Sequence, residues 1–131
     1  MLSLTLPWTP GPAAAAPPAR PVVMIAELEV RALRHVPGFL LASLKVRRAA
    51  RRAPGSLGVA LRTAPLRRTF WVLSAWTDHE SLHAFVRSDT HRAAMTALRP
   101  AMARSAFADW AADTPAAPRW AEAERQLASA A

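Results

Sequence analysis

The stretch TFWVLSAWTDHESLHAFVRSDTHRAAM, residues 69–95, decides the fold. Its first part, residues 70–76, is apolar on both strand parities apart from Ser74. A strand with one face in water alternates apolar and polar residues, whereas a near-continuous apolar run is typical of a strand covered on both faces. We therefore expect residues 69–76 to form a strand in the middle of a sheet.

Two helices are expected directly after this strand. The first should run over 78–86, with Thr77 as its N-cap and Glu80 as the partner in a capping box. The second should run over 89–99, because Ser88 is a favoured capping residue. The chain therefore turns abruptly from an apolar strand into a helical pair.

The remaining pattern completes an α+β domain. Strands are predicted over 22–30, 57–62 and 105–110, helices over 36–53 and 119–129, and a hairpin connection over 63–68. The order strand, helix, strand, strand, helix, strand is the ferredoxin-like split βαβ, a four-stranded antiparallel sheet with helices on one face. The other face needs a cover, and in a chain of 131 residues we expect a second copy, sheet against sheet, as a homodimer.

The domain organisation is expected to be a Pro/Ala-rich N-terminal arm over 1–21, a barrel domain over 22–112, and a linker and helix over 113–131. Residues 7–21 contain six prolines and a run of four alanines, which favours an extended linker or tail. The alternative is that Leu4, Leu6 and Trp8 dock on the domain.

Composition excludes several classes of function. The chain has no cysteine, so disulfides, thiolate catalysis and all-thiolate metal sites are excluded. No apolar run approaches the roughly 20 residues that span a bilayer, and no membrane partner is expected. The first twelve residues lack the basic flank and long apolar segment of a signal peptide. The cytoplasm is therefore the predicted compartment.

The net charge of +8 is uneven, with eleven basic and two acidic residues up to Thr77. Many of the basic residues crowd the end of the first helix and its surroundings: Lys45, Arg47, Arg48, Arg51, Arg52, Arg62, Arg67 and Arg68. They could form a patch for nucleic acid or an anionic ligand. No nucleic-acid motif accompanies them, so a solvated face is favoured and nucleic acid is not an expected partner.

Residues 79–83, HESLH, match the H-E-x-x-H pattern of zinc sites. Leu82 and Phe85 on the same helix must face the sheet, which turns His79 and His83 outward. No third ligand stands at the spacing of the extended zinc motifs. A solvated helix face is favoured, and no metal site is predicted.

A family resemblance rests on the strand from Phe70 to Trp76, the Thr77-Asp78 pair that follows, Leu82, Phe85, Ser88 and the run from His91 to Met95. From Val22 to about Trp110 the chain resembles the antibiotic biosynthesis monooxygenase-like superfamily of dimeric α+β barrels. The likeness is greatest to poorly characterised actinobacterial members related to spheroidene monooxygenase. The resemblance implies a pocket between the helices and the concave sheet, which in relatives holds a polyketide quinone precursor, haem or another flat hydrophobic ligand.

The resemblance also bears on cofactors. Haem-degrading relatives use an asparagine, a tryptophan and a histidine where this chain has Leu28, Phe85 and Met95. Cofactor-free relatives that oxidise phenols use asparagine, tryptophan and tyrosine, and this chain has neither asparagine nor tyrosine. No cofactor is predicted, with haem bound through His91 as the alternative.

The predicted site contains His91 as the catalytic or proton-transfer residue, with Trp76, Phe85, Met95 and Trp71 as ligand-binding residues. His91 could equally be a haem ligand or a structural residue at the start of its helix. Trp71 and Trp76 lie on opposite strand parities, so one should face the helices and the other the dimer side. The predicted function is a homodimeric barrel that binds a small hydrophobic or aromatic molecule and oxidises it in secondary metabolism. A haem protein and a non-catalytic ligand-binding module are the alternatives.

Overall fold

The computed structural model describes residues 3–130, so the first two residues of the predicted arm and the last residue of the chain lie outside it. The elements are β1 (Leu4–Pro10), β2 (Val22–Val30), α1 (Val36–Arg52), β3 (Ser56–Ala64), β4 (Thr69–Trp76), α2 (His79–Val86), α3 (Asp89–Leu98), β5 (Met102–Ala111) and α4 (Trp120–Ala130). Short 3-10 helices lie at Leu33–His35, Pro65–Arg67 and Arg99–Ala101.

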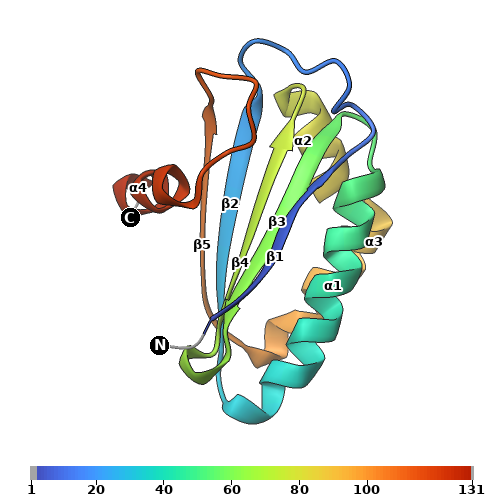
Figure 1. Ribbon diagram of the computed structural model, residues 1–131. Coiled ribbons are helices and arrows are strands. Elements are labelled where there is room, and N and C mark those ends of the chain that lie inside the picture. The colour runs from blue at the N-terminus through green and yellow to red at the C-terminus, as the bar shows by residue number, and fades with distance from the viewer. Residues whose placement is uncertain (1–2, 131) are drawn as a thin grey trace.

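The strands form one antiparallel sheet in the order β1-β3-β4-β2-β5. Helices α1, α2 and α3 lie on one face of this sheet and α4 lies on the other (Figure 1). The predicted α+β, ferredoxin-like architecture is confirmed, and the four strands expected from the sequence are all present. Across residues 3–130, no helix is both long and apolar enough to cross a membrane.

The sheet has five strands where the sequence predicted four. The additional strand, β1, comes from the predicted arm and pairs with the edge of β3, from Leu4 opposite Thr63 to Pro10 opposite Gly58. Without β1, the edge of β3 would leave its backbone N–H and C=O groups without partners. β1 is itself the edge strand of the sheet, and proline is tolerated in edge strands. Residues 4–10 therefore dock on the domain, although the proline-rich composition favoured a tail.

Side chains hold β1 in place. The Trp8 indole lies so close to Gly58 that a Cβ atom at position 58 would be 2.4 Å from the ring. Arg47, on α1, donates a hydrogen bond of 2.5 Å from Nη2 to the Thr9 Oγ1 atom. The glycine thus permits a close approach that no larger residue would allow.

The predicted strand at the centre of the sheet is confirmed by its burial. Phe70 and Trp76 have exposed fractions of 0%, and Leu73 of 1%. The even-numbered side chains of β4 pack toward α1, α2 and α3, and Leu73 packs on the opposite side of the sheet. Both faces of β4 are therefore covered, as its apolar run indicates.

The cap of α2 differs from the prediction by one residue. Asp78, not Thr77, is the N-cap, and its carboxylate accepts a hydrogen bond of 2.7 Å from the Ser81 backbone N–H. This hydrogen bond holds the pKa of the Asp78 carboxyl below its ordinary value. Asp accepts this bond as well as Ser or Thr does, so two adjacent capping residues cannot be separated by type alone. The predicted cap of α3 is confirmed, since Ser88 Oγ accepts from the His91 backbone N–H at 3.3 Å.

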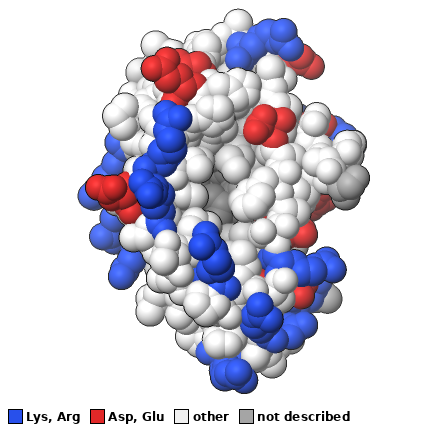
Figure 2. Space-filling model, turned by 180° about the vertical axis from the view of Figure 1, so that it is seen from behind, with Lys and Arg blue, Asp and Glu red and all other residues white. Residues whose placement is uncertain are grey.

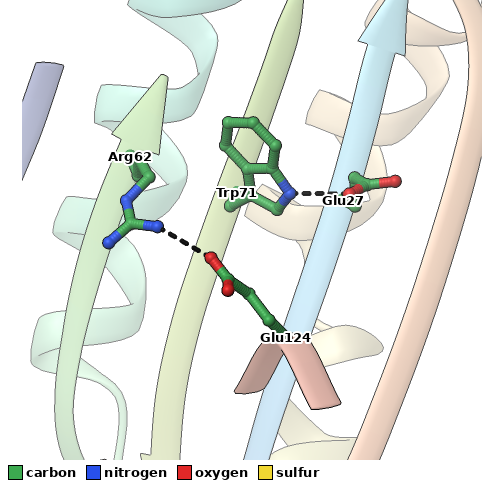
Figure 3. Close-up of polar contacts among 4 residues, drawn as sticks. All are labelled: Glu27, Arg62, Trp71 and Glu124. Atoms are coloured by element: carbon green, nitrogen blue, oxygen red, sulfur yellow. Dashed lines mark hydrogen bonds and ion pairs between the residues drawn. The ribbon is translucent and has the colours of Figure 1, made fainter. Parts of the chain in front are cut away.

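The sheet face expected to lie against a second copy is covered in part by the chain's own α4. The Arg62 guanidinium lies 4.2 Å from the centre of the Trp120 ring and 3.2 Å from the Glu124 carboxylate. Trp71 lies beside Arg62 on the same face and donates a hydrogen bond of 2.7 Å to Glu27 (Figure 3). These polar contacts add to the packing of Ala123 and Leu127 of α4 on the apolar side chains of this sheet face.

Candidate functional site

A cavity of about 330 Å³ lies between the sheet and the helices α1, α2 and α3. Figure 2 shows the molecule from the side of α2 and α3, with a hollow near its centre that is rimmed mainly by uncharged side chains. The lining residues come from the three strands β2, β4 and β5 and the three helices α1, α2 and α3: Met24, Ala26, Leu28, Val46, Ala50, Val72, Ser74, Leu82, Phe85, Val86, His91, Met95 and Phe107. Ser74 and His91 are the polar side chains among them, so the cavity suits a ligand that is mostly apolar.

His91 projects into this cavity from the first turn of α3. Its ring meets the Phe85 ring edge-on, with centroids 5.2 Å apart and planes at 68°. Burial lowers the pKa of the His91 imidazole below 6.5, and a hydrogen bond to the Val86 backbone opposes this shift. The neutral form of the ring is therefore favoured at pH 7.

Phe85 and Met95 line the cavity as the sequence led us to expect, and Trp76 lies one layer behind them. The Trp76 and Phe85 rings are stacked, with centroids 5.2 Å apart and an angle of 27° between planes. Trp76 is fully buried and does not appear among the lining residues. It supports Phe85 from behind, whereas the prediction placed it against the ligand.

Trp71 lies on the opposite face of the sheet from the cavity. The opposite parities of Trp71 and Trp76 placed one of them on each face, and the structure has this arrangement. Trp71 packs near α4, where Glu27 binds its indole N–H and Arg67 lies 6.0 Å from its ring. Trp71 and the cavity therefore do not share a surface. Of the five predicted site residues, the structure brings Phe85, His91 and Met95 together.

Sequence reasoning missed Ser74 and Phe107 as lining residues. Ser74 carried a signal, because it is the one polar interruption of the apolar β4 run. Phe107 lies on β5 opposite Ala26, and almost half of its side chain is exposed at the mouth of the cavity. Phe107 stands between two alanines in the sequence, and this pattern does not indicate a cavity-lining residue.

The H-E-x-x-H residues lie outside the cavity on the exposed side of α2. The His79 and His83 rings are 5.9 Å apart, and His79 Nε2 lies 3.6 Å from an Asp109 carboxylate oxygen on β5. Among residues 3–130, no cluster of three or more His, Cys, Asp or Glu side chains could hold a metal ion. The motif contributes a solvated helix face and a contact to the edge strand.

Haem does not fit the residues that are present. A neutral imidazole such as His91 could ligate iron, but the cavity of about 330 Å³ lies at the lower end of the range for drug-sized ligands. None of its lining residues is cationic, so the lining offers no partner for haem propionates. A compact aromatic molecule matches this cavity better.

The basic residues do not converge on one surface. Arg47 reaches Thr9 on β1, Arg62 binds Glu124 on the α4 face, and Arg68 donates to the Arg31 carbonyl at 2.9 Å. In Figure 2 the blue Lys and Arg side chains are spread around the margin of the molecule, at the upper end, both sides and the lower end, with a largely white centre. A single anion-binding patch is not formed from the predicted set.

Comparison with known proteins identifies the class of protein. Residues 21–97 match the antibiotic biosynthesis monooxygenase family, which covers more than half of the chain. The chain therefore belongs to this family, as its resemblance indicated. A search of the curated proteins gives no match.

Solved structures share the fold at low identity. A candidate antibiotic biosynthesis monooxygenase from Nitrosomonas europaea has a TM-score of 0.68 and 15% identity, over 76% of this chain and 97% of that one. SnoaB, a cofactor-independent oxygenase from Streptomyces nogalater, has a TM-score of 0.62 and 19% identity, over 76% and 98%. A candidate monooxygenase from Fusobacterium nucleatum has a TM-score of 0.65 and 13% identity, over 70% of this chain and 42% of that one.

Proposed function

We propose that this chain binds a small aromatic molecule in the cavity and oxidises it as a monooxygenase-like enzyme of secondary metabolism. The observation that carries the proposal is an almost wholly apolar cavity with a neutral imidazole in its wall. Phe85 and Met95 would contact the rings of the ligand, and His91 would exchange a proton with it. SnoaB, which shares the fold, is described as a cofactor-independent oxygenase, and this supports a reaction without a cofactor. The cytoplasm stays the predicted compartment.

The reaction needs no cofactor if the substrate is a carbon acid activated by an aromatic ketone, because the substrate carbanion itself reacts with oxygen. The unprotonated His91 nitrogen takes a proton from the acidic C–H bond, and the carbanion that remains transfers electrons to molecular oxygen. A methylene group and O₂ are then converted into a carbonyl group and water. The protein contributes orientation, exclusion of water and the removal and return of a proton.

Filling the cavity should weaken binding without unfolding the protein. Ala26 lies on β2 between Val72 and Phe107 and lines the cavity. In Ala26→Phe the new ring would occupy space that the ligand needs, so affinity for 1-tetralone, measured by isothermal titration calorimetry, should fall about tenfold or more, or roughly 1.4 kcal/mol. The matched control is Ala103→Phe, on an exposed position of β5 outside the lining. Equal affinity in wild type and Ala26→Phe would place binding elsewhere.

A homodimer remains part of the proposal. Trp71, Trp110 and Trp120 are each only partly buried around α4, and tryptophan is enriched in protein interfaces. Sedimentation velocity at micromolar concentration should therefore give a species of twice the 14.2 kDa chain mass. A species of single-chain mass at every concentration tested would contradict the dimer and leave the cavity unaffected.

A binding module without catalysis gives a different result in the same assays. It would retain tight binding of 1-tetralone and its sensitivity to Ala26→Phe. It would not accelerate oxygen uptake in the presence of anthrone, a carbon acid of the expected class. Oxygen consumption therefore separates the two functions.

A further inference from the structure

We infer that Ser74 is a hydrogen-bond donor for an oxygen atom of the ligand, and that Trp76 orients it for this task. The inference rests on the proposed function and adds a polar subsite to the apolar cavity. It means that the ligand carries an acceptor oxygen, such as a carbonyl or phenolate, on the edge that meets the sheet.

The position of Ser74 favours a role in binding. Its side chain lies on β4 between Met24 of β2 and Val59 of β3, at the floor of the cavity. Only 7% of the residue is exposed. A hydroxyl buried this deeply among apolar side chains is costly unless its hydrogen-bonding capacity is used.

Trp76 uses one of the two acceptor positions of this hydroxyl. The Trp76 indole N–H donates to Ser74 Oγ at 3.0 Å, and an indole nitrogen can only donate. The serine oxygen is thus an acceptor in this pair, which leaves its own proton for another partner. Among residues 3–130 no hydrogen bond from the Ser74 hydroxyl to an acceptor is present.

The arrangement makes Ser74 a better donor than an isolated hydroxyl. Consecutive hydrogen bonds polarise one another. The hydrogen bond that Ser74 accepts from the Trp76 N–H therefore strengthens the hydrogen bond that Ser74 donates. Trp76 is fully buried and stacked on Phe85, which fixes the direction of its N–H. The buried tryptophan therefore acts on the ligand through Ser74 rather than by contact.

Ser74 and His91 together would fix the orientation of the ligand. Ser74 approaches from the sheet and His91 from α3, and the rest of the lining is apolar. An oxygen atom bound at Ser74 draws charge from the ring as the carbanion forms, while the acidic C–H bond faces the imidazole. A ligand without that oxygen leaves the Ser74 hydroxyl proton without an acceptor. The site should therefore bind such a ligand more weakly than one that carries the oxygen.

The test compares two molecules that differ in one oxygen, 1-tetralone and tetralin, by isothermal titration calorimetry. Wild type should bind 1-tetralone more tightly than tetralin. Ser74→Ala should lower the affinity for 1-tetralone roughly fivefold to tenfold and leave that for tetralin unchanged. Ser105→Ala, an exposed serine on β5, is the matched control and should change neither.

Ser74→Ala leaves the buried Trp76 N–H without a partner and could impair folding. Ser74→Cys keeps the size of the side chain with a weaker donor, and should give an intermediate preference for 1-tetralone. An undiminished preference for 1-tetralone in Ser74→Ala or Ser74→Cys would overturn the role of Ser74 and leave the proposed function standing. Failure of wild type to bind either molecule would overturn both.

Discussion

Replacing His91 with glutamine is expected to slow the oxidation of anthrone by about 10²–10⁴-fold, the usual contribution of a general base. Glutamine retains a hydrogen-bonding group of similar size but cannot accept the proton from carbon. Binding of 1-tetralone should change far less, because the remainder of the lining is intact. Oxygen uptake in an electrode cell measures the rate. His83→Gln, on the exposed side of α2, is the matched control and should keep the wild-type rate.

The pH dependence of the rate provides a second readout for His91. Burial lowers its pKa below 6.5, so the imidazole stays unprotonated through neutral pH and loses activity only in more acidic solution. The rate should therefore be flat around pH 7 and fall below about pH 6.5. A wild-type rate in His91→Gln, with the same acid limb, would remove His91 from the reaction.

The same shift in pKa links His91 to stability. Because the folded state disfavours the charged imidazole, the unfolded state binds more protons in the interval just below pH 6.5. The free energy of unfolding should fall as the pH is lowered through this interval. His91→Gln should lose this part of the pH dependence in urea titrations.

Replacing Trp76 with alanine is expected to cost about 3–5 kcal/mol of the free energy of unfolding, the usual range for a buried aromatic residue. The side chain is fully buried, stacks on Phe85 and gives its N–H to Ser74. Its loss would leave a hole behind the cavity wall, let Phe85 fall back and release Ser74. Urea denaturation measures the first effect, and binding of 1-tetralone should weaken with it.

Trp110→Ala is the control for this large substitution. Trp110 is partly exposed and packs on the α4 face of the sheet, away from the cavity. Its loss should cost less stability and leave ligand affinity unchanged. If Trp76→Ala and Trp110→Ala were equally stable and bound 1-tetralone equally well, the cavity wall would not depend on Trp76. Should Trp76→Ala fail to fold, Trp76→Phe preserves much of the stack and still removes the hydrogen bond to Ser74.

The fold was largely predictable because the central strand β4 and the helices that follow it have simple sequence patterns. The apolar run of β4 and the helices after it required only burial and capping arguments. The strand β1 was not predictable from composition, because its prolines are compatible with a tail as well as with an edge. Its place depends on a distant partner, the free edge of β3, and on Gly58, which admits Trp8. The pattern of residues 4–10 alone indicates neither the free edge of β3 nor the role of Gly58.

The position of α4 was unpredictable for a similar reason. Its helical pattern was clear, but a proline-rich link does not say which sheet face the helix will cover. Ala123 on α4 packs against Ile25 on β2 and Leu73 on β4, and these partners are far apart in the sequence. Part of the sheet face expected to lie against a second copy is thus covered by a segment of the chain itself.

The sequence predicted which residues lie near the candidate site better than it predicted how close each one lies to the cavity. Phe85, His91 and Met95 line the cavity, whereas Trp76 stands behind it and Trp71 lies across the sheet. Strand parity gives the face of a side chain but not its depth, since depth depends on the neighbours that fill the space in front of it. Phe85 fills that space here, and so Phe85 rather than Trp76 lines the cavity.

A crystal structure of wild-type protein with 1-tetralone most directly tests the claim that the space between the sheet and α1–α3 is a binding site. We expect the ligand in that cavity, with its ring against Phe85 and Met95 and its oxygen beside Ser74. A ligand bound on any other surface, with the cavity closed by the movement of its own lining residues, would contradict the account.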